Sequence, residues 1–219
     1  MSINNNLLAI KSQLPEKVAL VAVSKTKPVS DLMEAYEAGQ RIFGENKIQE
    51  MTDKWQTMPK DIQWHMIGHV QTNKVKFMAE YVSLIHGVDS LKLLEEINKQ
   101  AKKHNRVIDC LLQMHIAEEE TKFGLNHSEL NEILQYIQDE KNEMKNINIA
   151  GLMGMATFTD NQNQIKKEFE NLKTIFDSIQ TSTFKPQILS MGMSGDYKLA
   201  IDHGSTLVRI GSSIFGGRS

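Results

Sequence analysis

The sequence lacks most features that would place a protein outside the cell or in a membrane. Its 219 residues include 1 cysteine, Cys110, so no intrachain disulfide can form, and a reducing, cytoplasmic setting is the default expectation. No apolar run reaches the ~18 residues that a membrane-spanning helix needs, and the N-terminus has no apolar signal-peptide core. Linkers rich in proline, glycine or serine are also missing, which favours one domain over residues 1–219.

The sequence also lacks a large excess of positive or negative charge. The chain has 25 lysines and arginines against 27 aspartates and glutamates, a formal net charge of -2, so it has no overall attraction to nucleic acid or to an anionic membrane. His65 and His69 are four residues apart, but no aspartate, glutamate or cysteine accompanies them at a useful spacing. We therefore expect no metal site. His69, near the mouth of the third strand, is either a pocket residue or a hydrogen-bonded histidine that faces the interior, and we expect the second.

What the sequence does contain is a regular alternation. Short apolar segments rich in β-branched residues alternate with segments whose apolar residues recur at helical spacing, as in Val29, Leu32 and Tyr36. The strand-like segments are 18–24, 41–46, 62–68, 82–88, 107–116, 147–155, 187–193 and 206–210. Buried strands that alternate with helices predict a parallel sheet, and this number of strands favours a closed (β/α)8 barrel. An open, doubly wound sheet is the alternative.

In such a barrel the functional site lies at the C-terminal ends of the strands, and phosphate groups commonly bind after strands 7 and 8. Lys25 ends the first predicted strand and Asn46 the second. After the seventh strand, Gly192 and Gly195 would let a ligand approach the backbone, and Ser194 is expected to cap the next helix.

The eighth predicted strand is followed by Gly211, Ser212 and Ser213, which offer further N–H and hydroxyl donors. Two neighbouring loops rich in donors predict a phosphate site, although ordinary turns have the same composition. Arg209 stands in this otherwise apolar strand, and a buried charge needs a partner. That partner is either a core carboxylate or a ring nitrogen or carboxylate of a ligand.

A lysine at the mouth of a barrel is also chemically informative. A partly desolvated ammonium near another cation has a lowered pKa and becomes a nucleophile toward carbonyls. Lys27 would be that cation if Thr26 stays extended, and Pro28 favours an extended conformation at Lys27; otherwise both lysines simply cap the strand in solvent. Together, the amine of Lys25, a phosphate site and a partner for a ring nitrogen are the contacts that pyridoxal 5′-phosphate (PLP) needs.

Five motifs carry a resemblance to a known family. "AVSKTKP", "AGQRIFGEN", "WHMIGHVQTNK", "LSMGMSGD" and "GSTLVRIGSSIFG" resemble, in this order over residues 18–217, the pyridoxal phosphate homeostasis protein family. That family is similar in fold to the N-terminal barrel of alanine racemase. The resemblance implies PLP as the cofactor, held as a Schiff base on the first lysine of the "SKTKP" motif, Lys25.

The resemblance also implies roles for other residues. It assigns phosphate contacts to Ser194, Gly211 and Ser212, the pyridine nitrogen to Arg209, and a place in the pocket to Asn46. Two positions depart from the family pattern. Ser212 stands where threonine is usual, which keeps the hydroxyl donor, and Phe123 stands where many relatives have a small residue.

Two functions would share this site. The first is a non-enzymatic carrier or buffer of PLP in intracellular PLP homeostasis, with PLP-accepting apo-enzymes as partners. The second is an amino-acid racemase of the alanine racemase type. Racemisation needs a second acid/base, which in alanine racemase is a tyrosine from a separate C-terminal domain, and this sequence ends at Ser219 directly after the eighth strand. We therefore expect a monomeric carrier without catalytic residues.

Arg209 also bears on two other classes of enzyme, the aminotransferases and the Schiff-base aldolases. An arginine at the ring nitrogen keeps its proton, so the pyridine stays unprotonated and is a weak electron sink, which disfavours aminotransferase chemistry. A Schiff-base aldolase acting on a phosphorylated sugar would use the same phosphate site, but it would not explain Arg209.

Overall fold

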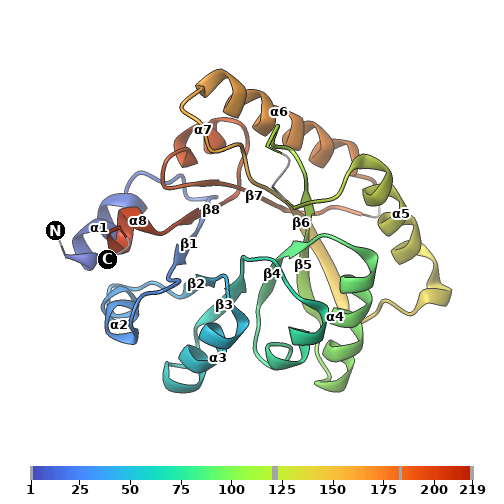
Figure 1. Ribbon diagram of the computed structural model, residues 1–219, viewed down its shortest axis with the longest axis horizontal. Helices are drawn as coiled ribbons and strands as arrows, with labels where there is room; N and C mark the ends of the chain where they lie inside the picture. Colours follow the sequence, from blue (N-terminus) through green and yellow to red (C-terminus); the bar gives the residue numbers. More distant parts are fainter. Residues whose placement is uncertain (1, 120–122, 183, 218–219) are drawn as a thin grey trace.

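The computed structural model describes residues 2–119, 123–182 and 184–217, and its strands close into a barrel of eight parallel strands (Figure 1). Each strand pairs with the next along the chain, and β1 closes the barrel by pairing with β8, where Val21 lies opposite Arg209. The predicted (β/α)8 barrel is confirmed, and the open-sheet alternative is wrong.

The elements follow the predicted alternation. The strands are β1 (Ala19–Val23), β2 (Ile42–Glu45), β3 (Gln63–Met66), β4 (Leu84–Val88), β5 (Ile108–Met114), β6 (Ile147–Gly154), β7 (Ile188–Met193) and β8 (Leu207–Ile210). The helices are α1 (Ile3–Lys11), α2 (Val29–Glu37), α3 (Ile48–Thr57), α4 (Leu91–Lys103), α5 (His127–Gln138), α6 (Gln162–Ser178), α7 (Tyr197–Asp202) and α8 (Ser212–Phe215), with 3-10 helices η1 (Thr72–Phe77) and η2 (Glu140–Asn142). After β3 the short η1 takes the place of an α-helix.

The first and last helices of the chain lie next to each other on one side of the barrel. Helix α1 precedes β1 and lies beside α8 (Figure 1), where the side-chain amide of Asn6 donates to the carbonyl of Ile214 over 3.0 Å. None of the helices in the described ranges is long and apolar enough to cross a membrane.

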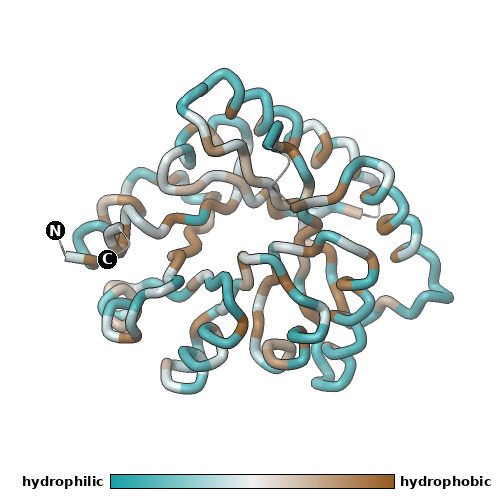
Figure 2. The backbone as a smooth tube through the Cα atoms, viewed as in Figure 1, coloured by the Kyte–Doolittle hydropathy of each residue, from teal (hydrophilic) through white to brown (hydrophobic). Residues whose placement is uncertain are grey.

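Two apolar layers hold the barrel together. The larger layer fills the space between strands and helices and includes Phe43, Trp64 and Phe169. Hydrophobic residues follow the strands and the inner helix faces, whereas the outer helix surfaces are hydrophilic (Figure 2). The smaller layer, which contains Leu84 and Leu207, lies inside the barrel. Full burial of one such side chain stabilises the fold by about 1.5–3 kcal/mol.

Helix ends are specified by local side chains. Asn126 accepts from the backbone of Glu129, and the Glu129 side chain accepts from the backbone of Asn126, so α5 begins with a complete capping box. Ser90 caps α4 through the N–H of Leu93.

The barrel interior also holds two histidines, His65 on β3 and His86 on β4. Both are buried, and Nδ1 of His65 lies 3.0 Å from Nε2 of His86. Burial lowers the pKa of His65 to about 3 and that of His86 well below its usual value, so both imidazoles are neutral at physiological pH. In the unfolded chain a histidine has a pKa of about 6.5. The unfolded chain therefore binds more protons than the folded protein between pH 6.5 and about pH 3.

This difference predicts a stability that declines in acid. The contribution of His65 is fully present above pH 6.5 and falls by up to about 1.4 kcal/mol per pH unit as the pH drops toward 3. In His65→Gln, which has no titrating group at this position, that part of the slope should disappear. Urea unfolding of both proteins between pH 4.5 and 8 measures the difference, which should be constant above pH 7.5. Parallel curves over the whole range would contradict the assignment.

Candidate functional site

A cavity of about 640 Å³ opens at the C-terminal ends of the strands, a volume usual for a small-molecule site. It is bounded by the ends of β1, β2, β3, β5, β6, β7 and β8 and the segments that follow them. The lining includes all six residues predicted from the sequence as cofactor-binding: Lys25, Asn46, Ser194, Arg209, Gly211 and Ser212. The fold therefore brings these positions together around one space.

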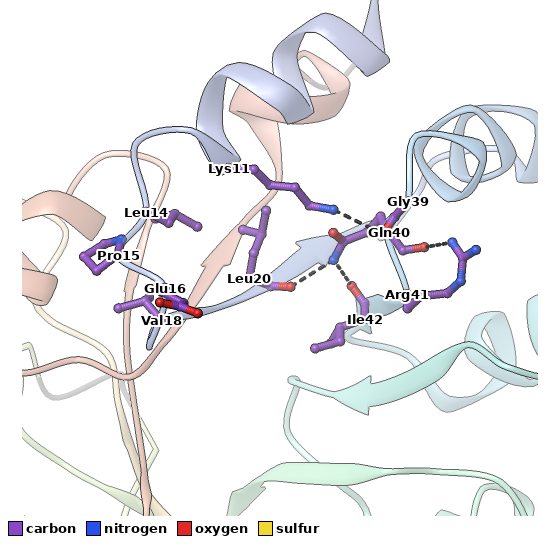
Figure 3. Close-up of a pocket in the computed structure, with 10 residues that line it drawn as sticks. All are labelled: Lys11, Leu14, Pro15, Glu16, Val18, Leu20, Gly39, Gln40, Arg41 and Ile42. Atoms are coloured by element: carbon purple, nitrogen blue, oxygen red, sulfur yellow. Dashed lines mark hydrogen bonds between the residues drawn. The ribbon is translucent and has the colours of Figure 1, made fainter.

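A second, smaller hollow lies at the opposite end of the barrel, where β1 and β2 begin (Figure 3). Its volume is about 350 Å³. The cations there are already engaged, because Lys11 donates to the carbonyl of Gly39 over 3.2 Å and Arg41 pairs with Asp61 over 2.9 Å. In barrels of this kind the N-terminal end contributes stability and not chemistry. We therefore place the functional site in the larger cavity.

Lys25 lies in a turn and not at a strand end. Strand β1 stops at Val23, and the N–H of Lys27 donates to the carbonyl of Ser24 over 3.1 Å. The expectation that Thr26 is extended is wrong, because its φ of 65° lies in the left-handed region. Lys25 and Lys27 both line the cavity, and Nζ of Lys27 donates to the carbonyl of Gly217 over 2.9 Å.

An ion pair lies directly beneath this turn. The hydroxyl of Ser24 donates to Glu45 over 2.6 Å, and the ammonium of Lys54 lies 2.7 Å from the same carboxylate. Lys54 also donates to the carbonyl of Ser24 over 2.9 Å. The Glu45 side chain is 0 % exposed, and its burial raises the pKa of the carboxyl although Lys54 opposes this effect.

The other side of the turn is held by Glu50 on α3. Its carboxylate accepts from the N–H of Thr26 over 2.6 Å and pairs with Lys54 over 2.7 Å. Ser24 and Thr26, which flank Lys25, are thus bound to one network that is buried at Glu45 and Lys54 and reaches the surface at Glu50, so the network determines where the Lys25 backbone lies. Sequence reasoning missed this network, although Lys54 follows Met51 by three residues and so falls on the apolar face of its helix.

The loops after β7 and β8 meet at one corner of the cavity. The N–H of Gly211 donates to the hydroxyl of Ser194 over 3.3 Å, and Gly211 is the N-cap of α8, which begins at Ser212. N–H groups in the first turn of a helix have no partner within the helix. Hydroxyls and backbone donors therefore gather where the sequence predicted a phosphate site.

Two details of the β7 loop differ from expectation. Helix α7 begins at Tyr197 with Asp196 as its N-cap, so Ser194 does not cap it. Gly192, with a φ of 96°, is required by packing, because a Cβ there would lie 2.6 Å from Cβ of Ala200. A Cβ at Gly195 would instead meet nothing within 4 Å, so only Gly195 leaves room for a ligand.

Arg209 is 4 % exposed and reaches the cavity from inside the barrel. One terminal nitrogen donates to the hydroxyl of Ser190 and the other to the carbonyl of Gly154 over 3.2 Å. Burial lowers the pKa of Arg209 to about 10, with Asp196 acting in the opposite direction, so the guanidinium remains a cation at neutral pH. The hydrogen bonds that hold it go to neutral groups, and the carboxylate of Asp196 is the negative charge that stabilises the guanidinium.

The rim of the cavity is aromatic. His69 lines the cavity, the alternative that the sequence left open, and does not face the interior as expected, since its side chain is 45 % exposed and its Nδ1 lies 3.1 Å from a carboxylate oxygen of Asp89. Its ring stacks on Phe123 with centroids 4.5 Å apart. Phe158, in the loop after β6, is 93 % exposed. Phe123 was recognised from the sequence as a departure from the family pattern. Its contact with His69 was not, because the two residues lie in loops that are distant in the chain.

Comparisons with known proteins agree with this geometry. The family model described as "Alanine racemase, N-terminal domain" matches residues 1–219. A pyridoxal phosphate homeostasis protein of Vibrio alginolyticus is 37% identical over 233 residues, covering 99% of this chain and 98% of the relative. One from Schizosaccharomyces pombe is 40% identical over 225 residues, covering 99% and 93%. The chain belongs to the pyridoxal phosphate homeostasis protein family.

Solved structures extend the comparison. The structure of PipY from Synechococcus elongatus with PLP bound is 34% identical, with a TM-score of 0.87 and coverage of 98% of this chain and 100% of that chain. Alanine racemase from E. faecalis has a TM-score of 0.81 at 16% identity and shares 58% of its length with this chain. The racemase thus shares the fold, and the family members share the sequence as well.

The network beneath Lys25 generates a stability prediction. Lys54→Met should lower the free energy of unfolding by about 3–5 kcal/mol, because it leaves the buried carboxylate of Glu45 without its cation. The double variant Glu45→Gln, Lys54→Met should recover much of this loss. Chemical denaturation measures all three proteins. Lys166→Met, which removes an exposed pair with Glu170, is the control and should change stability by less than about 1 kcal/mol. Equal losses in the two lysine variants would contradict the prediction.

Proposed function

We propose that this protein binds PLP and holds it as a carrier or buffer, without turning over a substrate. The observation that carries the proposal is the single cavity lined by an amine (Lys25), a corner of hydroxyl and N–H donors, and a buried guanidinium (Arg209). The names of the family relatives, and the PipY structure with PLP bound, support it.

The residues fit the cofactor group by group. Ser194, Gly211 and Ser212 would hold the phosphate, and the open space at Gly195 admits it. Lys25 would form the covalent linkage, and Asn46 would contact the ring. PLP, when bound, supplies an aldehyde that condenses with amines and a pyridine ring that draws electrons.

Arg209 would set the electronic character of the bound ring. A guanidinium can only donate, so a ring nitrogen that faces it must present a lone pair. At neutral pH Arg209 keeps its proton, and the nitrogen therefore stays unprotonated. Such a ring withdraws electrons weakly, which suits storage better than transformation of amino acids.

The racemase alternative requires a second proton donor across the ring from Lys25, within about 2.6–3.2 Å of the reacting carbon or one water away. None of the four tyrosines lines the cavity. Their side chains are engaged elsewhere: Tyr36 with Asp61, Tyr81 with Trp55, Tyr136 with Glu95 and Tyr197 with Gln13. The tyrosine that serves alanine racemase has no counterpart among the residues around this cavity.

The proposal includes a setting and a partner class. The carrier acts as a monomer in the cytoplasm, where Cys110 remains a buried free thiol, and it supplies PLP to apo-enzymes. The exposed rim at Phe158 supports exchange, because a ligand can leave the cavity without unfolding of the barrel.

The covalent linkage should form at Lys25 and not at Lys27, because Lys25 is held by the buried network, whereas Lys27 donates to a backbone carbonyl at the rim. Borohydride reduction of the PLP-loaded protein, followed by peptide mapping, should locate the label on Lys25. Lys25→Ala should lose the visible chromophore, and Lys27→Ala is the matched control that should retain it. A label on Lys27 would refute the assignment.

The PLP-loaded protein should not invert amino acids. Incubation with single L-amino acids in D₂O, followed by chiral chromatography and mass spectrometry, should show no accumulation of the D-enantiomer above a protein-free PLP control. Free PLP provides the matched background, since it exchanges α-protons slowly by itself. Rapid inversion of any one amino acid would overturn the carrier proposal and restore the racemase.

A further inference from the structure

A chain of side-chain hydrogen bonds crosses the inside of the barrel and ends at Arg209. The guanidinium donates to the hydroxyl of Ser190 on β7, which lies 3.1 Å from Nδ1 of His86 on β4. Nε2 of His86 then lies 3.0 Å from Nδ1 of His65 on β3. All four side chains are buried. The chain joins the consecutive strands β3 and β4 to the consecutive strands β7 and β8, and its central bond, between His86 and Ser190, spans 104 residues.

The direction of every bond in this chain follows from its Arg209 end. A guanidinium has donors only, so the Ser190 oxygen accepts from it. The Ser190 hydroxyl proton then needs an acceptor of its own, and within the described part of the chain that acceptor is Nδ1 of His86. If Nδ1 of His86 donated instead, the buried hydroxyl proton would have no partner, which is costly.

The same reasoning determines which ring nitrogen carries the proton in each of the two imidazoles. With its Nδ1 accepting, a neutral His86 carries its proton on Nε2 and donates it to Nδ1 of His65. A neutral His65 therefore also carries its proton on Nε2. Both histidines are neutral because of their burial, so each is a single tautomer with its Nδ1 as an acceptor.

The direction of these hydrogen bonds fixes the orientation of the Arg209 guanidinium at the cavity. A serine hydroxyl can rotate about its C–O bond, and only some orientations present a lone pair to a cation. The acceptor at His86 draws the proton away from Arg209, so the lone pair of Ser190 faces the guanidinium. The carbonyl of Gly154 holds the other terminal nitrogen. The guanidinium is thus fixed in plane by two acceptors.

We propose that Ser190 and His86 are positioning residues that orient Arg209 toward the ring nitrogen of bound PLP, with His65 as the anchor of the chain. This inference rests on the proposed function, because it assumes that the ring nitrogen of PLP faces Arg209. The positioning residues act through Arg209 and need not touch the cofactor.

The test compares PLP with 1-deaza-PLP, in which a C–H group replaces the ring nitrogen. The wild-type protein should bind PLP about tenfold or more tightly than the analogue, the magnitude expected for a hydrogen bond to a charged group. Ser190→Ala and His86→Phe should reduce this preference to about threefold or less, with little change in the affinity for the analogue. His86→Gln, which keeps an acceptor and a donor, should restore part of the preference.

Ser205→Ala is the matched control. Ser205 is also buried, but its hydroxyl donates to the carbonyl of Met191 over 2.7 Å, and it lies outside the chain. This variant should keep the wild-type preference. An unchanged preference in both Ser190→Ala and His86→Phe would overturn the positioning role, as would a wild-type protein that binds both compounds equally. A wild-type protein that fails to bind PLP would refute the proposed function itself, which the same titration reveals directly.

A measurement on the unmodified protein avoids dependence on variants that fold poorly. In ¹⁵N-histidine NMR, protonated and unprotonated ring nitrogens have well separated shifts. His65 and His86 should both show a protonated Nε2 and an unprotonated Nδ1. A proton on Nδ1 of His86 would reverse the chain and overturn the inference.

Discussion

Closure of the sheet between β1 and β8 is the constraint on which the site depends. The two strands pair in parallel over Ala19 to Ala22, and this pairing places the first and last loops of the barrel side by side. Lys25 and Gly211 are far apart in the chain and share a cavity only because the barrel closes. In an open sheet β1 and β8 would be separated, and Lys25 would not lie beside the hydroxyl and N–H donors that follow β8.

The second constraint is the burial of charge around this cavity. Glu45 and Lys54 lie behind the turn of Lys25, and Arg209 lies inside the barrel, where an isolated charge would be costly. Each of the three side chains has specific hydrogen-bond partners within the protein. Such pairs contribute little net stability compared with apolar residues of the same size, but they hold backbone and side chains in one arrangement. For the PLP carrier proposed above, that arrangement is the functional requirement.

The strand and helix pattern was accessible from the sequence because it depends on local periodicity. Apolar runs such as 18–24 and stripes such as Val29, Leu32 and Tyr36 report on burial directly. The positions of Lys25 and Arg209 in the cavity followed from the rule that strand ends and inward-facing residues converge in a closed barrel. The expectations that failed concerned local geometry, such as the left-handed backbone at Thr26 and the cap of α7 at Asp196.

The sequence by itself determined the barrel, the side of the barrel that carries the site and the residue types around it, since all of these follow from periodicity and strand order. Only the tertiary structure decided which partner each polar group has. The pairing of Glu45 with Lys54 and the chain from His65 to Arg209 join residues on separate elements. Hydrogen bonds depend on distances of about 3 Å and on direction, and no pattern along one chain encodes contacts of that kind between strands.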